Sequence, residues 1–483
     1  MSQFKTTIGL EIHVELNTKR KIFCDCANPA SLKSGISERE PNTFCCPVCM
    51  GFPGTLPKTN ELAIKYVRLA GLALNCELSK NSKFDRKHYF YPDLPKGYQI
   101  SQYDMPFCKN GWLEIRNPKS EIRNKFEIQN SNDQNEDKIK VRINRVHLEE
   151  DAGKLIHPKD SNESLVDLNR AGTPLVEIVT EPDLHSPSKA AEFVKQLREV
   201  IRATGISQAD MEKGHLRCDA NIDVSTGNHK SPIVEIKNLN SFRFIEKALE
   251  FEVLRLQEDI NNWPKEKSKI TRGFNSKTGE TYEQRRKEEA ADYRYFPEPD
   301  LPNYTISDGE IKKLKTEISD LPEDVENQLS EIGLNKEQIS LLSSDSNLRK
   351  IFDVILKNIN DPKLIISYLM LIRGVSVRIP AEELIKLLQK IKSGNITNEI
   401  GKRVILQIAE GKKTEEVLEE YKKSEYNLDE IIEKVISENQ KAVDDFKNGR
   451  QNAIGFLIGQ VMKKTKGAAD PQEVSKSIIN KLK

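Results

Sequence analysis

The segment Ile8-Gly-Leu-Glu-Ile-His-Val-Glu-Leu16 alternates aliphatic residues with residues of other kinds. Successive side chains of an extended strand point to opposite faces, so Glu11, His13 and Glu15 share one face and the aliphatic residues share the other. Two further segments mix acidic, imidazole and aliphatic groups: His147-Leu-Glu-Glu-Asp-Ala-Gly153 and Gly172-Thr-Pro-Leu-Val-Glu-Ile-Val-Thr180. An ionised carboxylate in an apolar run, such as Glu177, is costly unless it is paired or bound to a cation. We therefore interpret the three segments as parts of a site that holds a magnesium nucleotide.

The candidate magnesium ligands are Glu11, His13, Glu149 and Glu177. Magnesium prefers oxygen ligands in octahedral geometry, and nucleotide phosphates would complete its coordination shell. His13 is the least suitable of the four, because imidazole is a softer ligand than magnesium favours. The alternative for the face that carries Glu11 and His13 is a solvated strand surface with ordinary salt bridges.

The composition describes a globular chain of several domains, with 483 residues, 31% charged residues and a net charge of +1. No apolar run approaches the roughly 18 residues of a membrane-spanning helix. The first seven residues, Met-Ser-Gln-Phe-Lys-Thr-Thr, lack the apolar core of a signal peptide, so we expect a cytoplasmic protein with no membrane contact. All 7 histidines and 8 cysteines lie at or before position 229, which places the expected metal and acid–base chemistry in the first half.

The pattern along the chain predicts an α+β fold in three domains. Residues 1–305 mix predicted strands (7–16, 140–148, 174–180, 220–224, 232–236) with predicted helices (60–74, 188–204, 242–260). The polar segment 115–137 is expected to be an exposed hairpin or loop. Three prolines in residues 295–302 predict a boundary, since proline interrupts regular structure. Residues 306–410 then read as a helical domain and residues 411–483 as a helical tail domain.

The tail carries a basic cluster. Between Lys447 and Lys483 there are eight basic and two acidic residues. Lys463, Lys464 and Lys466 gather where a predicted helix ends, a position at which cations suit the helix dipole. We interpret these three lysines as candidates for contact with RNA phosphates, and the alternative is a solvated helix face.

Four cysteines have a spacing close to that of a zinc site. Cys24-x-Cys26 and Cys46-x-x-Cys49 are separated by 19 residues. Cys45 adjoins Cys46, so the sequence leaves the fourth ligand open. The alternative is a set of reduced, unbound thiols, since disulfides are not expected in a chain without an export signal.

A segment dense in aromatic, basic and amide groups, residues 84–102, is expected to form a wall of the site. Such groups suit stacking on a base or ribose and binding of phosphate or carboxylate. Its candidate residues are Lys87, Tyr89, Tyr91, Lys96, Gln99 and Ser101. Arg170 and Lys237 lie in polar segments within apolar surroundings and are candidates for phosphate contact, with a buried hydrogen-bonded network as the alternative.

Several segments together resemble the GatB family, which supplies one of the subunits of the tRNA-dependent amidotransferase. They are residues 8–16, 82–102, 147–154, 166–183, 211–221, 235–241 and 292–300, and the C-terminal Ala453-Ile-Gly-Phe-Leu-Ile-Gly-Gln-Val-Met462. The resemblance covers nearly the whole chain and is loosest at 115–137 and in the helical middle. It implies a cradle domain with a mixed or antiparallel sheet, similar to glutamine synthetase, that binds Mg-ATP and the aminoacyl end of tRNA. It also implies helical and tail domains that hold the tRNA.

The resemblance implies a defined reaction. Family members convert Glu-tRNA(Gln) into Gln-tRNA(Gln), and in many organisms Asp-tRNA(Asn) into Asn-tRNA(Asn), by phosphorylating the side-chain carboxylate and displacing the phosphate with ammonia. A partner amidase makes the ammonia from glutamine, and a small third protein completes the heterotrimer. By the resemblance, Glu11, His13, Glu149 and Glu177 fall at metal positions, and Lys87, Lys96 and Glu150 line the ammonia path. The four cysteines fall at a zinc site that only some members retain.

Three alternatives remain at this point. One is a stand-alone ligase that forms an amide on a small metabolite, and another is a non-catalytic RNA-binding scaffold. The third is the archaeal glutamate-specific relative, which carries an inserted domain for which this chain has no room. The sequence contains neither a Gly-x-x-x-x-Gly-Lys-Ser/Thr phosphate loop nor a Gly-x-Ser-x-Gly elbow, which leaves P-loop ATPases and conventional serine hydrolases without support.

Overall fold

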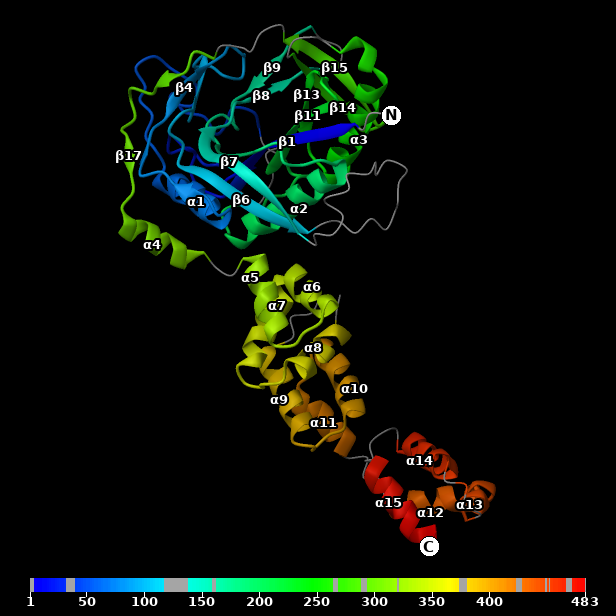
Figure 1. The fold of residues 1–483 in the computed structure, drawn as a ribbon. Coiled ribbons are helices and arrows are strands. Elements are labelled where there is room, and N and C mark those ends of the chain that lie inside the picture. The colour runs from blue at the N-terminus through cyan, green and yellow to red at the C-terminus, as the bar shows by residue number, and fades with distance from the viewer. Residues whose placement is uncertain are drawn as a thin grey trace. The chain divides into compact units, whose positions relative to one another are not determined.

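The structure, a computed structural model, describes most of the chain and forms two compact units (Figure 1). The described residues are 4–31, 40–116, 138–158, 162–263, 268–287, 293–318, 321–372, 380–422, 428–447, 450, 452–465 and 471–482. The first unit is Met1–Pro322 and the second is Glu323–Lys483. The expected hairpin at 115–137 lies almost wholly outside the described residues.

A ten-stranded sheet forms the centre of the first unit, with the strand order β15-β14-β13-β11-β1-β10-β7-β6-β2 and β12 paired to β11. Its strands are β1 (Lys5–Glu15), β2 (Glu77–Leu78), β6 (Cys108–Arg116), β7 (Lys138–Glu150), β10 (Pro174–Thr180), β11 (Leu216–Thr226), β12 (His229–Lys230), β13 (Ile233–Leu239), β14 (Lys269–Asn275) and β15 (Glu280–Lys287). Among the described strands of this sheet, β13 and β14 run parallel and the other paired neighbours run antiparallel. The predicted α+β class with a mixed sheet is confirmed.

Alternation in β1 gives the sheet two different faces. Ile8, Leu10, Ile12 and Val14 are essentially inaccessible to solvent, as the sequence pattern predicts. In β7 the buried positions shift by one residue between Ile143 and Val146, next to an irregularity in the register with β10. The shift keeps the charged residues of β7 on the same face as His13.

Three helices cover the apolar face of the sheet (Figure 1): α1 (Glu61–Ala73), α2 (Pro187–Ala203) and α3 (Phe242–Glu258). Asn60 caps α1 by accepting a hydrogen bond from the Leu62 amide, and Ser186 caps α2 by accepting one from Lys189. The sequence predicted all three within a few residues. Because helices cover the apolar face, the candidate functional residues can only lie on the polar face.

The segment 295–302, where the sequence predicted a domain boundary, contains a short strand. Its residues Phe296–Pro297 form β16, the edge strand of a small sheet in the order β16-β4-β5, with β4 (Asp85–His88) and β5 (Tyr98–Ser101). Proline is tolerated on an edge strand because no partner needs its missing amide hydrogen. The buried Glu298 accepts two hydrogen bonds from Arg86, each 2.8 Å long, and so ties the segment to the site wall.

Short elements complete the first unit: strand pairs β3 (Asn81–Ser82) with β17 (Tyr304–Thr305) and β8 (Lys154–Ile156) with β9 (Leu165–Asp167), the turns η1 (Pro29–Ser31) and η3 (Ile260–Asn262), and helix α4 (Asp308–Glu317). Ile306 and Leu314 pack into the core of this unit, which therefore continues beyond residue 305. The division into three domains remains a prediction.

The second unit is helical, as expected. Its helices are α5 (Pro322–Glu331), α6 (Lys336–Ser344), α7 (Ser346–Leu356), α8 (Pro362–Leu371), α9 (Ala381–Lys392), α10 (Asn398–Ala409), α11 (Thr414–Lys422), α12 (Leu428–Glu438), α13 (Gln440–Lys447), α14 (Asn452–Lys464) and α15 (Pro471–Leu482). Helices α5–α11 surround one hydrophobic cluster and α12–α15 surround another. Among the described helices, none is long and apolar enough to cross a bilayer.

Candidate functional site

Three neighbouring strands bring acidic and imidazole groups into one row on the polar face of the sheet. His13 of β1 is in register with Glu177 of β10, which is in register with His147 of β7. Glu149 follows two residues after His147 and points to the same face. The Nε2 atom of His13 lies 3.6 Å from Glu149 and 3.8 Å from Glu177. The antiparallel pairing of β1, β10 and β7 therefore builds the cluster.

The cluster has the donor set of a cation site. Ligand atoms of His13, Glu149 and Glu177 all lie within 4.8 Å of one another, and both carboxylates are buried. Two oxygen-donating carboxylates suit magnesium, and the imidazole is the weaker member on grounds of softness. The residues therefore fit a divalent cation that completes its shell with water or phosphate oxygens.

Electrostatics inside the cluster favour ionised carboxylates. Burial alone would raise the pKa of the Glu177 carboxyl, but His147 and His13 hold it well below its usual value. Burial alone would lower the pKa of His147, whose Nε2 is 3.1 Å from Glu177, but the two carboxylates raise it to about 8. A charged His147 thus partly offsets the acidic pair near neutral pH.

The structure does not bring Glu11 into this cluster. Glu11 lies on the same face of β1, two residues before His13, and its Oε1 accepts a hydrogen bond of 2.9 Å from the Asn221 amide. Glu15 lies at the other end of the row. Burial and repulsion from Asp151 raise the pKa of Glu15 to about 7, although the positive charge of Arg217 opposes this rise. Of the four predicted magnesium ligands, three converge and Glu11 flanks them.

The predicted wall residues Lys96, Gln99 and Ser101 contact the end of β7. Ser101 donates a hydrogen bond of 2.9 Å to Glu149, and Lys96 forms an ion pair with Glu150. The Gln99 side chain donates to the Glu150 carbonyl, and the Ile100 amide donates to the Glu150 carboxylate. The small sheet is thereby fixed to the acidic cluster.

Lys87 faces the cluster from β4. Its Nζ lies over the ring of Tyr293 at 4.9 Å and that of Tyr89 at 5.9 Å from the ring centroids. Burial alone would lower the pKa of this ammonium, but the Glu149 carboxylate in particular raises it. Among the described residues, Lys87 has no ion-pair partner, so its charge is available to an anionic substrate. Tyr91, the remaining predicted wall residue, is exposed.

Sequence reasoning missed residues on this face. The Nε atom of Arg145, two residues before His147, is buried without a hydrogen-bond partner among the described residues. Tyr293 and Tyr295 reach the site because β16 returns to β4. Strand alternation could have identified Arg145, because residues two apart in a strand point to the same face. For the two tyrosines no local signal existed, since prolines pointed to a boundary.

Arg170 and Lys237 lie in polar networks, the alternative that their sequence context left open. Arg170 donates to the carbonyl groups of Ala152 and Gly153 and pairs with Asp151. Lys237 lies 2.8 Å from Asp219 and 2.9 Å from Glu235. Burial alone would raise the pKa of Glu235, but Lys237 and a second lysine lower it to about 2. Both cations already have carboxylate partners.

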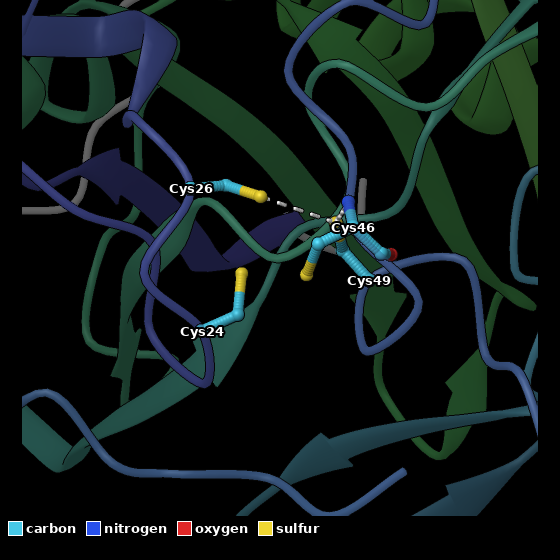
Figure 2. Close-up of side chains that lie close together, drawn as sticks. All are labelled: Cys24, Cys26, Cys46 and Cys49. Carbon is cyan, nitrogen blue, oxygen red and sulfur yellow. Dashed lines mark hydrogen bonds between the residues drawn. The ribbon is translucent and has the colours of Figure 1, made fainter.

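The four predicted cysteines converge at a second cluster (Figure 2). The sulfur atoms of Cys24, Cys26, Cys46 and Cys49 lie within 4.8 Å of one another, with Cys49 at 3.9 Å from Cys26 and 3.8 Å from Cys46. A tetrahedral zinc with bonds of about 2.3 Å places its sulfurs about 3.8 Å apart. The cysteine cluster therefore fits a structural zinc ion.

Cys45 points elsewhere, with its sulfur 3.9 Å from the side-chain oxygen of Asn169. The hydrogen bond with Cys24 lowers the pKa of the Cys49 thiol to about 4, and the nearby Lys21 contributes to the lowering. Lys21 is wholly buried, and its Nζ donates a hydrogen bond of 2.7 Å to the Phe44 carbonyl. A buried cation beside thiolates offsets the negative charge that four cysteine ligands bring to a zinc ion.

A cavity of about 220 Å³ lies between the cysteine cluster and the small sheet. Cys24, Cys49 and Gly51 line one side, and Lys96 and Glu150 line another. The ion pair of Lys96 and Glu150 therefore forms part of the lining of this cavity.

The basic cluster of the tail is less cationic than the sequence suggests. Lys464 pairs with Glu438, and Lys481 pairs with Asp429 and Glu433 of α12. Lys463 is exposed and has no ion-pair partner among the described residues, and Lys466 lies outside them. Acidic residues of α12 therefore cancel part of the positive charge carried by α14 and α15.

Comparison with known proteins gives matches over nearly the whole chain. The family described as GatB/GatE catalytic domain matches residues 6–312, and the family described as GatB domain matches residues 372–482. The chain is similar to proteins named as the B subunit of aspartyl/glutamyl-tRNA(Asn/Gln) amidotransferase. That of Thermotoga maritima is 42% identical, covering 99% of both chains, and that of Thermodesulfovibrio yellowstonii is 42% identical over 100% of both. That of Thermoanaerobacter pseudethanolicus is 40% identical over 99% of both.

Proposed function

The chain belongs to the GatB family of tRNA-dependent amidotransferase subunits, and on this premise we propose how its sites carry out the reaction. The reaction is the glutamine-dependent formation of a carbon–nitrogen bond on misacylated tRNA. We infer that this chain holds the aminoacyl end of Glu-tRNA(Gln), Asp-tRNA(Asn) or both, that it works with an amidase subunit and a small third subunit, and that it uses ATP and magnesium.

The observation that carries the proposal is the cluster of half-buried His13 with buried Glu149 and Glu177 on the polar face of the sheet. A side-chain carboxylate is a poor electrophile, so its oxygen first attacks the γ-phosphorus of ATP and ADP leaves. Ammonia then attacks the acyl carbon and inorganic phosphate leaves, giving the amide and a proton. When bound, magnesium would offset the repulsion between the carboxylate and the triphosphate.

The residues around the cluster have distinct parts in this scheme. The ammonium of Lys87 faces the carboxylates without an ion-pair partner among the described residues and is suited to hold an anionic group of the substrate. The Nε atom of Arg145 offers a second cationic donor on the same face. Glu150 is held by Lys96 and by the Ile100 amide. As the family resemblance implies, we infer that it borders the path of ammonia, where it can accept the proton that ammonia releases. Ser101 holds Glu149 in place.

The cysteine cluster is proposed as a structural zinc site with Cys24, Cys26, Cys46 and Cys49 as ligands. Structural zinc sites are closed by four protein ligands, and the four sulfurs here leave no ligand position for a substrate. The zinc would hold the turns at Cys24–Cys26 and Cys46–Cys49 together.

The experiment that tests the proposed function is a transamidation assay on the complex of this chain with its two partner subunits. Glu-tRNA(Gln) and Asp-tRNA(Asn) are supplied separately with ATP, magnesium and glutamine. Formation of Gln-tRNA or Asn-tRNA is expected. Amide formation on free glutamate in the absence of tRNA would instead favour a stand-alone ligase, and no ATP turnover at all would favour a binding scaffold.

Removing the tail is expected to weaken tRNA binding. The chain is best truncated after Lys422 and not after Gly411, because Val417 and Leu418 of α11 are buried in the cluster formed by α5–α11. Loss of α12–α15 removes exposed cations such as Lys463, and we expect affinity for tRNA to fall roughly tenfold and its salt dependence to become shallower. The measurement is binding of tRNA to the complex at fixed salt.

A pair of single substitutions provides the control for the truncation. Lys463→Ala removes an exposed lysine, whereas Lys464→Ala removes a lysine already paired with Glu438. The first is expected to weaken tRNA binding more than the second. Unchanged affinity after truncation would contradict a role of the tail in holding tRNA.

A further inference from the structure

The turn that carries two of the cysteines rests directly on the backbone of Lys96. Gly51 ends this turn at a φ of +67°, and a Cβ atom built on it would lie 2.9 Å from Cγ, 3.0 Å from N and 3.2 Å from Cα of Lys96. Two of these atoms belong to the backbone, so the contact cannot be relieved by a side-chain rotation. A side chain at position 51 would therefore require the Lys96 backbone to move by a few tenths of an ångström.

Hydrogen bonds within the turn and just before it in the chain hold its conformation. The amides of Met50, Gly51 and Phe52 donate to the carbonyl groups of Cys46, Val48 and Pro47, respectively. Just before the turn in the chain, the Phe44 carbonyl accepts a hydrogen bond from the wholly buried Lys21, which also donates to the Leu168 carbonyl. The turn is therefore a fixed surface against which Lys96 packs.

The position of Lys96 is passed on to Glu150, the last residue of β7, through short contacts. Its Nζ pairs with Glu150, and Glu150 also accepts a hydrogen bond of 2.8 Å from the Ile100 amide. A shift of the Lys96 backbone would therefore displace the Lys96–Glu150 pair, which lines the cavity beside the cysteine cluster.

We propose that Gly51 is a positioning residue for amide formation. It allows the cysteine turn to set the backbone of Lys96, and thereby the place of the Lys96–Glu150 pair at which ammonia meets the activated acyl group. This inference rests on the proposed function, and it adds a role for the cysteine turn: the turn orders a wall of the nucleophile's path as well as folding the chain. Gly51 acts through Lys96 and contacts no reacting atom.

The test compares Gly51→Ala with Gly54→Ala in the assembled complex. Gly54 lies in the same turn region at a φ of +79°. Apart from its two chain neighbours, no atom of the described residues lies within 4 Å of a Cβ placed there, so it shares the backbone strain without the contact. Ammonium chloride replaces glutamine as the nitrogen donor. We expect Gly51→Ala to raise the KM for ammonium about tenfold, since displacements of about 1 Å cost that much or more. Gly54→Ala is expected to leave it unchanged.

A second readout separates positioning from general damage. Formation of ADP that depends on misacylated tRNA reports the phosphorylation step, and it is expected to change less than about twofold in Gly51→Ala. Equal effects on ADP formation and on the KM for ammonium would overturn the proposal, as would identical behaviour of the two glycine variants. Failure of the proposed function is distinguishable, because the wild-type complex would then form no amide.

Two further variants keep the test decisive if Gly51→Ala folds poorly. Asparagine tolerates a positive φ, so Gly51→Asn retains the close contact with Lys96 while it reduces the backbone strain. Gly51→Asn is expected to reproduce the rise in KM. In a Lys96→Met background, adding Gly51→Ala is expected to change the KM no further. Lys96→Met already removes the ion pair with Glu150 through which Gly51 acts. Additive effects in this cycle would overturn the inference.

Discussion

Replacing Glu177 or Glu149 with glutamine in the assembled complex is expected to lower amide formation by about a hundredfold to a thousandfold. Each change removes one negative charge from a buried group whose ligand atoms lie within 4.8 Å of His13 and of each other. The remaining charge attracts a divalent cation less strongly and offsets less of the repulsion between the substrate carboxylate and the triphosphate. Hydrolysis of glutamine by the amidase subunit is expected to stay within about twofold, because that chemistry lies in another chain.

The measurement is the initial rate of Gln-tRNA or Asn-tRNA formation at saturating ATP, magnesium and misacylated tRNA, alongside the release of glutamate from glutamine. Glu181→Gln is the matched control, since Glu181 follows β10 directly and accepts a hydrogen bond from Asn144 in an exposed position. Wild-type rates from both cluster variants would remove the metal role that we assign to these carboxylates.

The same assay tests whether Glu11 serves as a metal ligand during the reaction. Its carboxylate accepts a hydrogen bond from Asn221 and lies outside the cluster of His13, Glu149 and Glu177. If it stays there during the reaction, Glu11→Gln is expected to reduce the rate less than Glu149→Gln does. An equal loss would show that Glu11 joins the metal site when the nucleotide binds.

Replacing Cys46 with serine is expected to abolish zinc binding, whereas replacing the adjacent Cys45 with serine is expected to leave about one zinc per chain. Three thiolates hold zinc much less strongly than four, and the sulfur of Cys46 is 3.8 Å from that of Cys49. The Cys45 sulfur instead lies near Asn169 and outside the cluster. The measurement is the metal content of the purified complex after dialysis.

The two variants form a matched pair, because the cysteines are neighbours and both are partly exposed. The Cys46→Ser chain is also expected to unfold at a lower temperature than the Cys45→Ser chain, since a structural zinc contributes directly to folding. Zinc retained by Cys46→Ser and lost by Cys45→Ser would show that the ligand choice is the reverse. Wild-type complex without bound zinc after preparation with the metal present would reject the zinc site.

Periodicity in the sequence predicted the main elements of the first unit. The residues of a strand or helix that face the core are apolar, and they recur with the period of that structure. The run at 174–180 coincides with β10, and the alternation of Ile8–Leu16 gave the buried and polar faces of β1 correctly. The predicted helix at 60–74 coincides with α1, which the structure shows to be capped by Asn60. The candidate cluster residues His13, Glu149 and Glu177 followed from alternation together with the cost of a carboxylate in an apolar run.

Local sequence patterns could not predict features that depend on contacts between segments far apart in the chain. The prolines of 295–302 indicated a boundary, yet β16 pairs with β4 and brings Tyr293 and Tyr295 to the site. In the tail, the count of basic residues could not include the pairing of Lys464 with Glu438, since charge cancellation depends on how helices pack.

By itself, therefore, the sequence determined the α+β class, the five strands β1, β7, β10, β11 and β13, the helices α1–α3 and the kinds of chemistry available, because each of these depends on neighbours in the chain. Only the tertiary structure decided that Cys46 and not Cys45 joins the cysteine cluster, that Glu11 flanks the carboxylates, and that Gly51 rests on Lys96. Each of these choices is a matter of distances of a few ångströms between residues far apart in sequence. Such distances follow from strand order and the path of the connecting turns, which a local residue pattern does not specify.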